Sequence, residues 1–139
     1  MRIAAKRLRY TIEVFEPLYD GNLKPPRQIV REVQTMLGDI HDCDVWVEYL
    51  PQFLEEEHVR TLEYYGHTRP LNLLKSGIHY LPEERQQYRA KRYQEFVHFW
   101  QELKDQGTWE NLEQILRSRL EKVNADLEEQ MSTEKEENV

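Results

Sequence analysis

The stretch Met1-Arg-Ile-Ala-Ala-Lys-Arg-Leu-Arg-Tyr10 opens the chain with four cations and no acid, and it predicts a helix with two distinct faces. Arg2, Lys6 and Arg9 are spaced by four and three residues, so they share one side of an α-helix. A second, apolar stripe has helical spacing and is expected to be buried; it consists of Ala5, Leu8, Ile12 and Phe15. Like charges at this spacing repel one another by roughly 0.2–0.5 kcal/mol per pair, and the first acid is Glu13. The cationic side is therefore either an anion-binding face or a solvated basic face.

The composition is typical of one soluble globular domain with a highly charged exterior. The chain has 139 residues, a formal net charge of -7 and 32% charged residues. The single cysteine, Cys43, cannot form an internal disulfide, which predicts a reducing compartment. No apolar run follows the N-terminal charges as in a signal peptide, and no stretch approaches the roughly 18 apolar residues of a membrane span. These features predict a cytoplasmic protein with no membrane partner.

Charge is distributed unevenly along the chain. Residues 1–37 hold seven Lys/Arg and four Asp/Glu, a balance of +3, whereas residues 38–139 hold twelve and twenty-two, a balance of -10. An acidic protein does not attract polyanions over its whole surface, so anion binding requires local focusing of positive charge. Duplex DNA is not favoured as a partner, because its binding requires a broad basic surface.

Apolar residues recur at helical spacing along most of the chain, which predicts an all-α fold built as an antiparallel helical bundle. We expect the first helix to run to about Glu16 and a turn to follow at residues 20–22. Pro25-Pro26 should open the second helix, and Pro51 should end or kink it.

Further along, the sequence predicts a short third helix over residues 55–65 and a long irregular connection over residues 66–82, which holds two glycines and two prolines. A helix over residues 83–103 should end at Gly107, and a last helix should follow with an apolar stripe of Trp109, Leu112, Leu116, Leu120, Val123 and Leu127. We expect the bundle to span residues 1–129 and residues 130–139 to form a frayed polar tail.

Arg85, Arg89 and Arg92 repeat the four-then-three spacing of the N-terminal cations, and Tyr93 follows them as Tyr10 follows Arg9. One interpretation is a second row of cations facing the same cavity as the first row. The alternative is chance, because basic residues at helical spacing are common. If the two rows face different ways, two copies of the chain would complete one site as a homodimer.

The segment Leu37-Gly-Asp-Ile-His-Asp-Cys-Asp-Val45 is the second informative stretch. Gly38 would let a neighbouring helix or a ligand approach the backbone closely. Asp42 or Asp44 could orient the arginines of the first helix through bidentate pairs. The alternative is that both acids are solvated surface groups.

These two motifs together, Arg2-x3-Lys6-x2-Arg9-Tyr10 and Leu37-Gly38-x3-Asp42-x-Asp44-Val45, resemble the CHAD family of histidine-containing α-helical domains, over roughly residues 1–50. Members of this family bind inorganic polyphosphate with basic residues that line a cavity of a helical bundle. The resemblance implies that the ligand is polyphosphate or another phosphate-rich polyanion. It also implies that Arg2, Lys6, Arg9, Arg27 and Arg31 are phosphate ligands, supported by Tyr10, Asp42 and Asp44.

The chain departs from the family pattern in two ways. The histidine that gives the family its name normally lies just upstream of the position of Arg2, and no histidine precedes it here. The chain is also shorter than a full family domain. The resemblance therefore implies a short or partial member: a single-repeat form, a fragment, or half of an assembled site.

Two other functions are compatible with the sequence. His41-Asp42 is the adjacent pair of metal-dependent HD-type phosphohydrolases, but that metal site needs an earlier histidine, which this chain lacks. A helical protein-interaction module without a phosphate ligand is the other alternative. No nucleophile–base pair is recognisable, so the sequence assigns no catalytic residue, no metal ligand and no cofactor.

Overall fold

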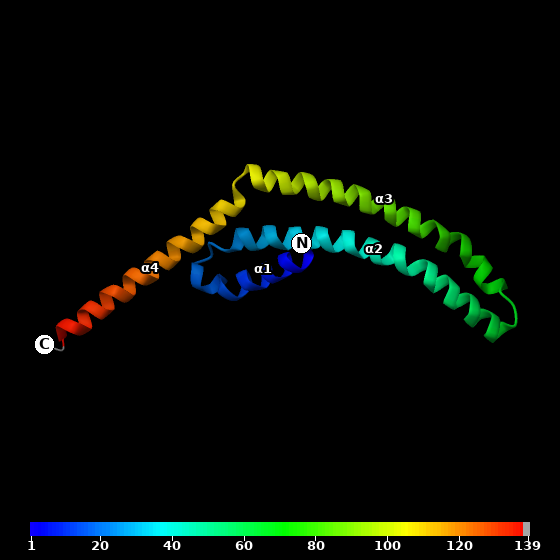
Figure 1. Ribbon diagram of the computed structural model, residues 1–139, viewed down its shortest axis with the longest axis horizontal. Coiled ribbons are helices and arrows are strands. Elements are labelled where there is room, and N and C mark those ends of the chain that lie inside the picture. The colour runs from blue at the N-terminus through cyan, green and yellow to red at the C-terminus, as the bar shows by residue number, and fades with distance from the viewer. Residues whose placement is uncertain (138–139) are drawn as a thin grey trace. The chain divides into compact units, whose positions relative to one another are not determined.

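The computed structural model describes residues 1–137, with the side chains of residues 1–75 and 77–132 (Figure 1). Its elements are α1 (Arg2–Phe15), the 3₁₀-helix η1 (Glu16–Tyr19), α2 (Lys24–Tyr65), α3 (Arg69–Asp105) and α4 (Thr108–Glu137). Helices account for most of residues 1–137, and no strand occurs within that range. The predicted all-α antiparallel bundle is confirmed.

Three short connections separate the helices. Asp20 adopts a left-handed φ of 50° after η1, and the amide of Lys24 donates to the carbonyl of Gly21 at 3.1 Å as α2 begins. The prolines at positions 25 and 26 lie in the first turn of α2, where a missing N–H costs no helical hydrogen bond. Gly107, with φ of 62°, separates α3 from α4 at the predicted stop.

The chain forms two compact units, and both α2 and α3 contribute to each of them. Unit 1 contains Met1–Arg2 and Val33–Phe99, and unit 2 contains Ile3–Glu32 and the residues from Trp100 onward. The expected bundle over residues 1–129 stays a prediction as a domain boundary.

Unit 1 is a hairpin of two long antiparallel helical segments, which run side by side in Figure 1. Ion pairs join them in antiparallel order: Arg89 of α3 to Asp44 of α2, and Arg92 to Asp39. The buried side chains of this unit come from both helices and are Val33, Met36, Ile40, Cys43, Leu50, Leu71 and Phe96.

Unit 2 has its own core. Its buried cluster draws on α1, the start of α2 and the start of α4, and consists of Ile12, Leu23, Val30 and Leu112. Tyr19, Trp109 and Ile115 pack against this cluster. Trp109 also contacts Trp100, with ring centroids 5.3 Å apart. Because the cluster joins three helices, it fixes α1 and therefore the direction of the cationic face.

The predicted end of the second helix at Pro51 and the predicted irregular connection over residues 66–82 are wrong, and the alternative of a kink at Pro51 stays a prediction. Helix α2 continues through Pro51 to Tyr65 and includes the expected third helix, and α3 begins at Arg69 and runs through Pro82 instead of following a long irregular connection. A proline removes one helical hydrogen bond, which costs a helix about 3 kcal/mol. Packing between the helices offsets this cost, since Leu50 and Leu71 are buried on either side.

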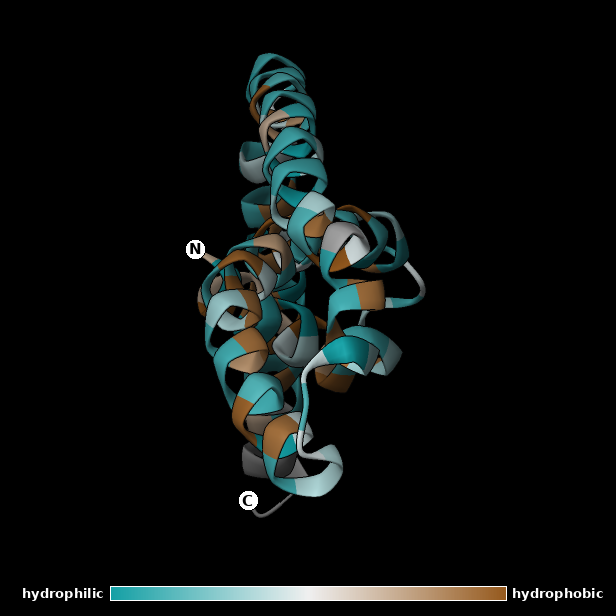
Figure 2. Cartoon of the chain, turned by 90° about the vertical axis from the view of Figure 1, so that its right-hand side faces the viewer, coloured by the Kyte–Doolittle hydropathy of each residue, from teal (hydrophilic) through white to brown (hydrophobic). Residues whose placement is uncertain are grey.

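The apolar stripe of α1 is only partly buried. Ala5 and Ile12 are buried as expected, but Leu8 and Phe15 are 37% and 47% exposed, so the prediction for these two is wrong. They flank the buried line instead of lying on it, because unit 2 covers only a narrow face of α1. Figure 2, coloured by hydropathy, shows hydrophobic stretches alternating with hydrophilic ones along the helices.

Along α4, only the first part of the apolar stripe is covered. Leu112 is buried, whereas the remaining members are exposed: Leu116, Leu120, Val123 and Leu127. The helix continues to Glu137. Fraying of residues 130–139 stays a prediction, and residues 138 and 139 lie outside the described part of the chain.

Candidate anion-binding site

The cationic face of α1 is intact in the structure. Because α1 is one continuous helix from Arg2 to Phe15, the spacing of Arg2, Lys6 and Arg9 places all three on the same side. Arg2 and Lys6 are exposed, and the side chain of Arg9 is 20% exposed beside the buried line of Ile12. Among the side chains that the structure describes, those of residues 1–75 and 77–132, neither Arg2 nor Lys6 forms an ion pair with a carboxylate. The N-terminal part of this face therefore carries uncompensated positive charge.

Tyr10 lies next to two of these cations. The guanidinium carbon of Arg9 is 4.5 Å from the centre of the Tyr10 ring, and Lys6 Nζ is 5.8 Å from it. A cation over an exposed aromatic ring gains about 0.5–1 kcal/mol. This attraction offsets much of the repulsion between Lys6 and Arg9 and holds both side chains along the helix. A supporting role of Tyr10 in anion binding stays a prediction, to which these two contacts add a physical basis.

At the C-terminal end of the cationic face, the negative charge of Glu13 partly compensates Arg9. Glu13 Oε1 lies 3.5 Å from Arg9 Nε, one helical turn further along. The first turn of α1, in contrast, contains no acid. The positive charge of α1 is therefore least compensated near Arg2 and Lys6.

Arg27 and Arg31 of α2 belong to the same compact unit as Lys6 and Arg9. Arg27 Nη1 contacts Glu16 Oε2 at 3.0 Å, at the edge of a surface hollow of ≈ 500 Å³ that α1, η1 and α2 form together. Arg31 is exposed, one turn further along α2.

The second row of arginines lies on the side of α3 that faces α2. Arg92 donates from Nε to Asp39 Oδ2 at 2.9 Å and from Nη1 to Glu95 Oε2 at 2.9 Å. Arg89 donates to both carboxylate oxygens of Asp44, and Arg85 contacts Glu84 at 3.1 Å.

These contacts change the titration of two guanidinium groups. The hydrogen bond that Arg92 donates to Glu95, with a further contribution from Asp39, raises the pKa of Arg92 above its usual range. The hydrogen bond and charge of Asp44 raise the pKa of Arg89 in the same way. All three arginines of this row have a carboxylate partner, unlike Arg2 and Lys6.

The acidic segment of α2 is divided between two environments. Asp44 binds Arg89 of α3, while Asp42 and the adjacent His41 are exposed. A role of Asp42 or Asp44 in orienting the arginines of α1 stays a prediction. A methyl group added at Gly38 would meet no atom within 4 Å, so in the described chain this position faces open space.

Sequence reasoning missed Asp39 and Glu95, which hold Arg92. The spacing of Arg92 and Glu95 by three residues on one helix is a local signal that predicts a contact. Asp39 lies 53 residues away from Arg92 in the chain, and no local pattern reveals such a pair.

Among the described residues, no three His, Cys, Asp or Glu side chains are grouped closely enough to hold a metal ion. The described helices also contain no segment with the length and hydropathy needed to cross a membrane.

Comparison with known proteins gives one match. The model of the CHAD domain family matches residues 1–51, which include α1, η1 and the first part of α2. No curated protein and no solved structure matches the chain significantly. The matched segment contains all of the cations of α1 together with Arg27 and Arg31. Residues 1–51 are therefore a partial match to the CHAD domain, consistent with a short or partial member of that family.

Proposed function

We propose that this chain binds inorganic polyphosphate, without catalysis, through a basic surface formed by Arg2, Lys6 and Arg9 of α1 with Arg27 and Arg31 of α2. The observation that carries the proposal is the uncompensated charge of Arg2 and Lys6 on the cationic face of α1, within the segment that matches the CHAD domain. That family is associated with polyphosphate binding.

The chemistry of these residues fits such a ligand. Polyphosphate carries about one negative charge per phosphate, so a row of cations releases counterions from it as proteins do from nucleic acids. The forked guanidinium of arginine binds two phosphate oxygens at once, and lysine adds a point charge. The first turn of α1 contains no acid that would compete with a phosphate for these cations. These local sources of positive field offset the net charge of -7 of the chain.

The second row, Arg85, Arg89 and Arg92, is proposed as an auxiliary contact only. A phosphate would have to compete with Asp44 for Arg89 and with Asp39 for Arg92. In each pair, the guanidinium N–H groups that would bind a phosphate already contact a carboxylate. We therefore expect most of the affinity to come from α1.

The first experiment is a titration with long-chain polyphosphate at 50 and 200 mM salt. If about three phosphates are neutralised, the single-strand slope of counterion release predicts a loss of affinity of about 20-fold over this range. The variant Lys6→Gln/Arg9→Gln should bind at least about tenfold more weakly. The matched control, Arg117→Gln/Arg119→Gln, removes two cations from α4 and should bind like the wild type.

Three results would count against the proposal. They are absence of binding at 50 mM salt, an affinity that does not respond to salt, and equal weakening by the α1 variant and the α4 control. Binding to protein partners without binding to polyphosphate would favour the protein-interaction alternative.

A homodimer is a further part of this proposal. The exposed apolar stripe of α4 and the exposed Trp46 of α2 leave apolar surface on both units, and two-fold pairing is the commonest association of identical chains. Light scattering at several concentrations gives the mass, and a monomer throughout would remove the dimer. A single cysteine, Cys43, without an internal partner is typical of proteins from a reducing compartment, which supports our proposal of the cytoplasm.

A further inference from the structure

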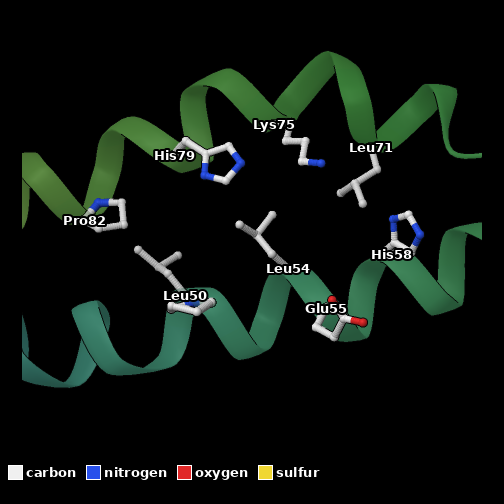
Figure 3. Close-up of a pocket in the computed structure, with 9 residues that line it drawn as sticks. Leu50, Leu54, Glu55, His58, Leu71, Lys75, His79 and Pro82 are labelled. Carbon is white, nitrogen blue, oxygen red and sulfur yellow. The ribbon is translucent and has the colours of Figure 1, made fainter.

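A hollow of ≈ 500 Å³ lies between α2 and α3 within unit 1, remote in sequence from the cations of α1 (Figure 3). Leu50 and Leu54 extend into it from α2, and Leu71, Lys75 and His79 extend into it from α3 (Figure 3). Leu50 and Leu71 are only 4% and 7% exposed, so they form an apolar floor. The volume falls within the range of about 300–1,000 Å³ that is typical of small-molecule sites.

The hollow lies at a level of the hairpin where both helices contain a proline. Pro51 of α2 and Pro82 of α3 both line it, which places a proline inside each helix at the same level of the antiparallel pair. A proline ring in a helix clashes with the carbonyl four residues earlier and pushes that turn away. The hollow thus coincides with the level at which each helix carries a proline.

The polar groups of the hollow are mainly basic. Lys75, His58 and His79 line its rim, with Glu55 as the acid among the lining residues. Lys75 forms no ion pair within the described part of the chain, and Glu55 lies beyond ion-pair distance from it. An unpaired ammonium group beside an apolar floor favours a ligand that supplies both an anion and a hydrocarbon surface.

From this arrangement we infer that the hollow binds a single-chain anionic amphiphile, that is, an alkyl or acyl chain ending in a carboxylate or a phosphate. The chain lies against Leu50, Leu54 and Leu71, and the head group accepts hydrogen bonds from Lys75 and from the imidazole of His79 or His58. Polyphosphate does not fit this site, because it has no apolar part to cover the leucines. The inferred site is thus separate from the polyphosphate surface, and either proposal can fail alone.

The test is calorimetric titration of the full chain with decanoate below its micelle concentration. Two reference compounds separate the parts of the ligand: 1-decanol has the same chain without the charge, and acetate has the head group without the chain. We expect decanoate to bind about tenfold more tightly than 1-decanol, since a hydrogen bond to a charged group contributes at least this factor. Acetate should show no binding. Decyl phosphate, used in the same way, shows which head group is preferred.

Three variants locate the site. Lys75→Gln should weaken decanoate binding about tenfold and leave 1-decanol unchanged, whereas Lys104→Gln, on the same helix outside the hollow, should change neither. Leu54→Trp should fill the space and abolish binding of both compounds. Circular dichroism verifies the helical fold of each variant. If Leu54→Trp does not fold, the Lys75→Gln and Lys104→Gln pair still decides the question.

Two outcomes would overturn the inference. One is that decanoate does not bind the wild-type chain. The other is that decanoate binds all variants equally, which would mean adsorption to the exposed apolar residues elsewhere on the chain. Decyl phosphate that binds with the same dependence on Lys75 would extend the site to phosphate head groups.

Discussion

Replacing Gly38 by alanine should stabilise the chain by about 0.5–1 kcal/mol, although glycine at this position invites a close contact. Gly38 lies inside α2, and its φ is not in the left-handed region. A Cβ built there meets no atom within 4 Å, so the methyl group costs no packing energy. Alanine loses less backbone entropy than glycine when a helix forms, and this difference is the source of the expected gain.

The gain can be measured by thermal unfolding, followed by circular dichroism at 222 nm. For a chain of this size, about 0.5–1 kcal/mol corresponds to a rise of about 2–4 °C in the midpoint. Two other glycines with equally open surroundings serve as controls. Gly77→Ala, inside α3, should give a similar rise. Gly66→Ala should lower the midpoint, since φ of 68° at this position costs an alanine about 1–2 kcal/mol.

A lower midpoint for Gly38→Ala, with the expected rise for Gly77→Ala, would refute the reasoning for the isolated chain. Such a result would mean that another surface packs against Gly38 in solution. Light scattering on the same samples distinguishes the explanations. A dimeric wild type that becomes monomeric in Gly38→Ala would identify this face of α2 as the contact between two copies.

Three further predictions concern side chains. Ile12→Ala should lower the free energy of unfolding by about 2–5 kcal/mol, because Ile12 is buried in the core of unit 2. Leu8→Ala should lower it much less, because Leu8 is 37% exposed. Urea titrations of both variants check this order, and equal losses would contradict it. A double-mutant cycle on Asp39 and Arg92 should give a coupling of about 0.5–1 kcal/mol, as expected for a partly exposed pair, and zero coupling would show that the pair is not formed in solution. Burial raises the pKa of the Cys43 thiol. The protonated thiol therefore favours the folded state at any pH below the pKa of Cys43 in the unfolded chain, and this contribution is lost as the pH rises through the alkaline range. Iodoacetamide should alkylate Cys43 far more slowly in the native chain than in urea, and equal rates would show that the thiol is accessible.

Sequence reasoning succeeded where a local rule and the tertiary packing agree. Pro25-Pro26 open α2 because a proline in the first helical turn removes no hydrogen bond. Gly107 ends α3 because its left-handed φ suits glycine. Ala5 and Ile12 are buried, as the helical spacing of the first apolar stripe indicates.

The same reasoning failed where contacts distant in sequence override a local rule. Pro51 and Pro82 are helix breakers by local chemistry, yet burial of Leu50 and Leu71 keeps both helices continuous. Spacing places Arg89 and Arg92 on one face, but it cannot show that Asp44 and Asp39, 45 and 53 residues away, already occupy that face. For the candidate site, the sequence therefore indicates which cations share a helix face, and only the structure shows which of them have partners.

The hairpin of α2 and α3 has a topological consequence. Its two cross-helix ion pairs and its buried leucines are all contacts between one helix and the other, and the connection that closes the hairpin is only residues 66–68. If that connection straightens, α2 of one chain can form the same contacts with α3 of a second chain, which is a domain-swapped dimer. The left-handed φ of Gly66 closes the turn, so that α2 and α3 of the same chain form these contacts. In a Gly66→Ala chain the closed turn is strained, whereas a continuous helix through residue 66 is not. This variant should therefore form domain-swapped dimers at high concentration.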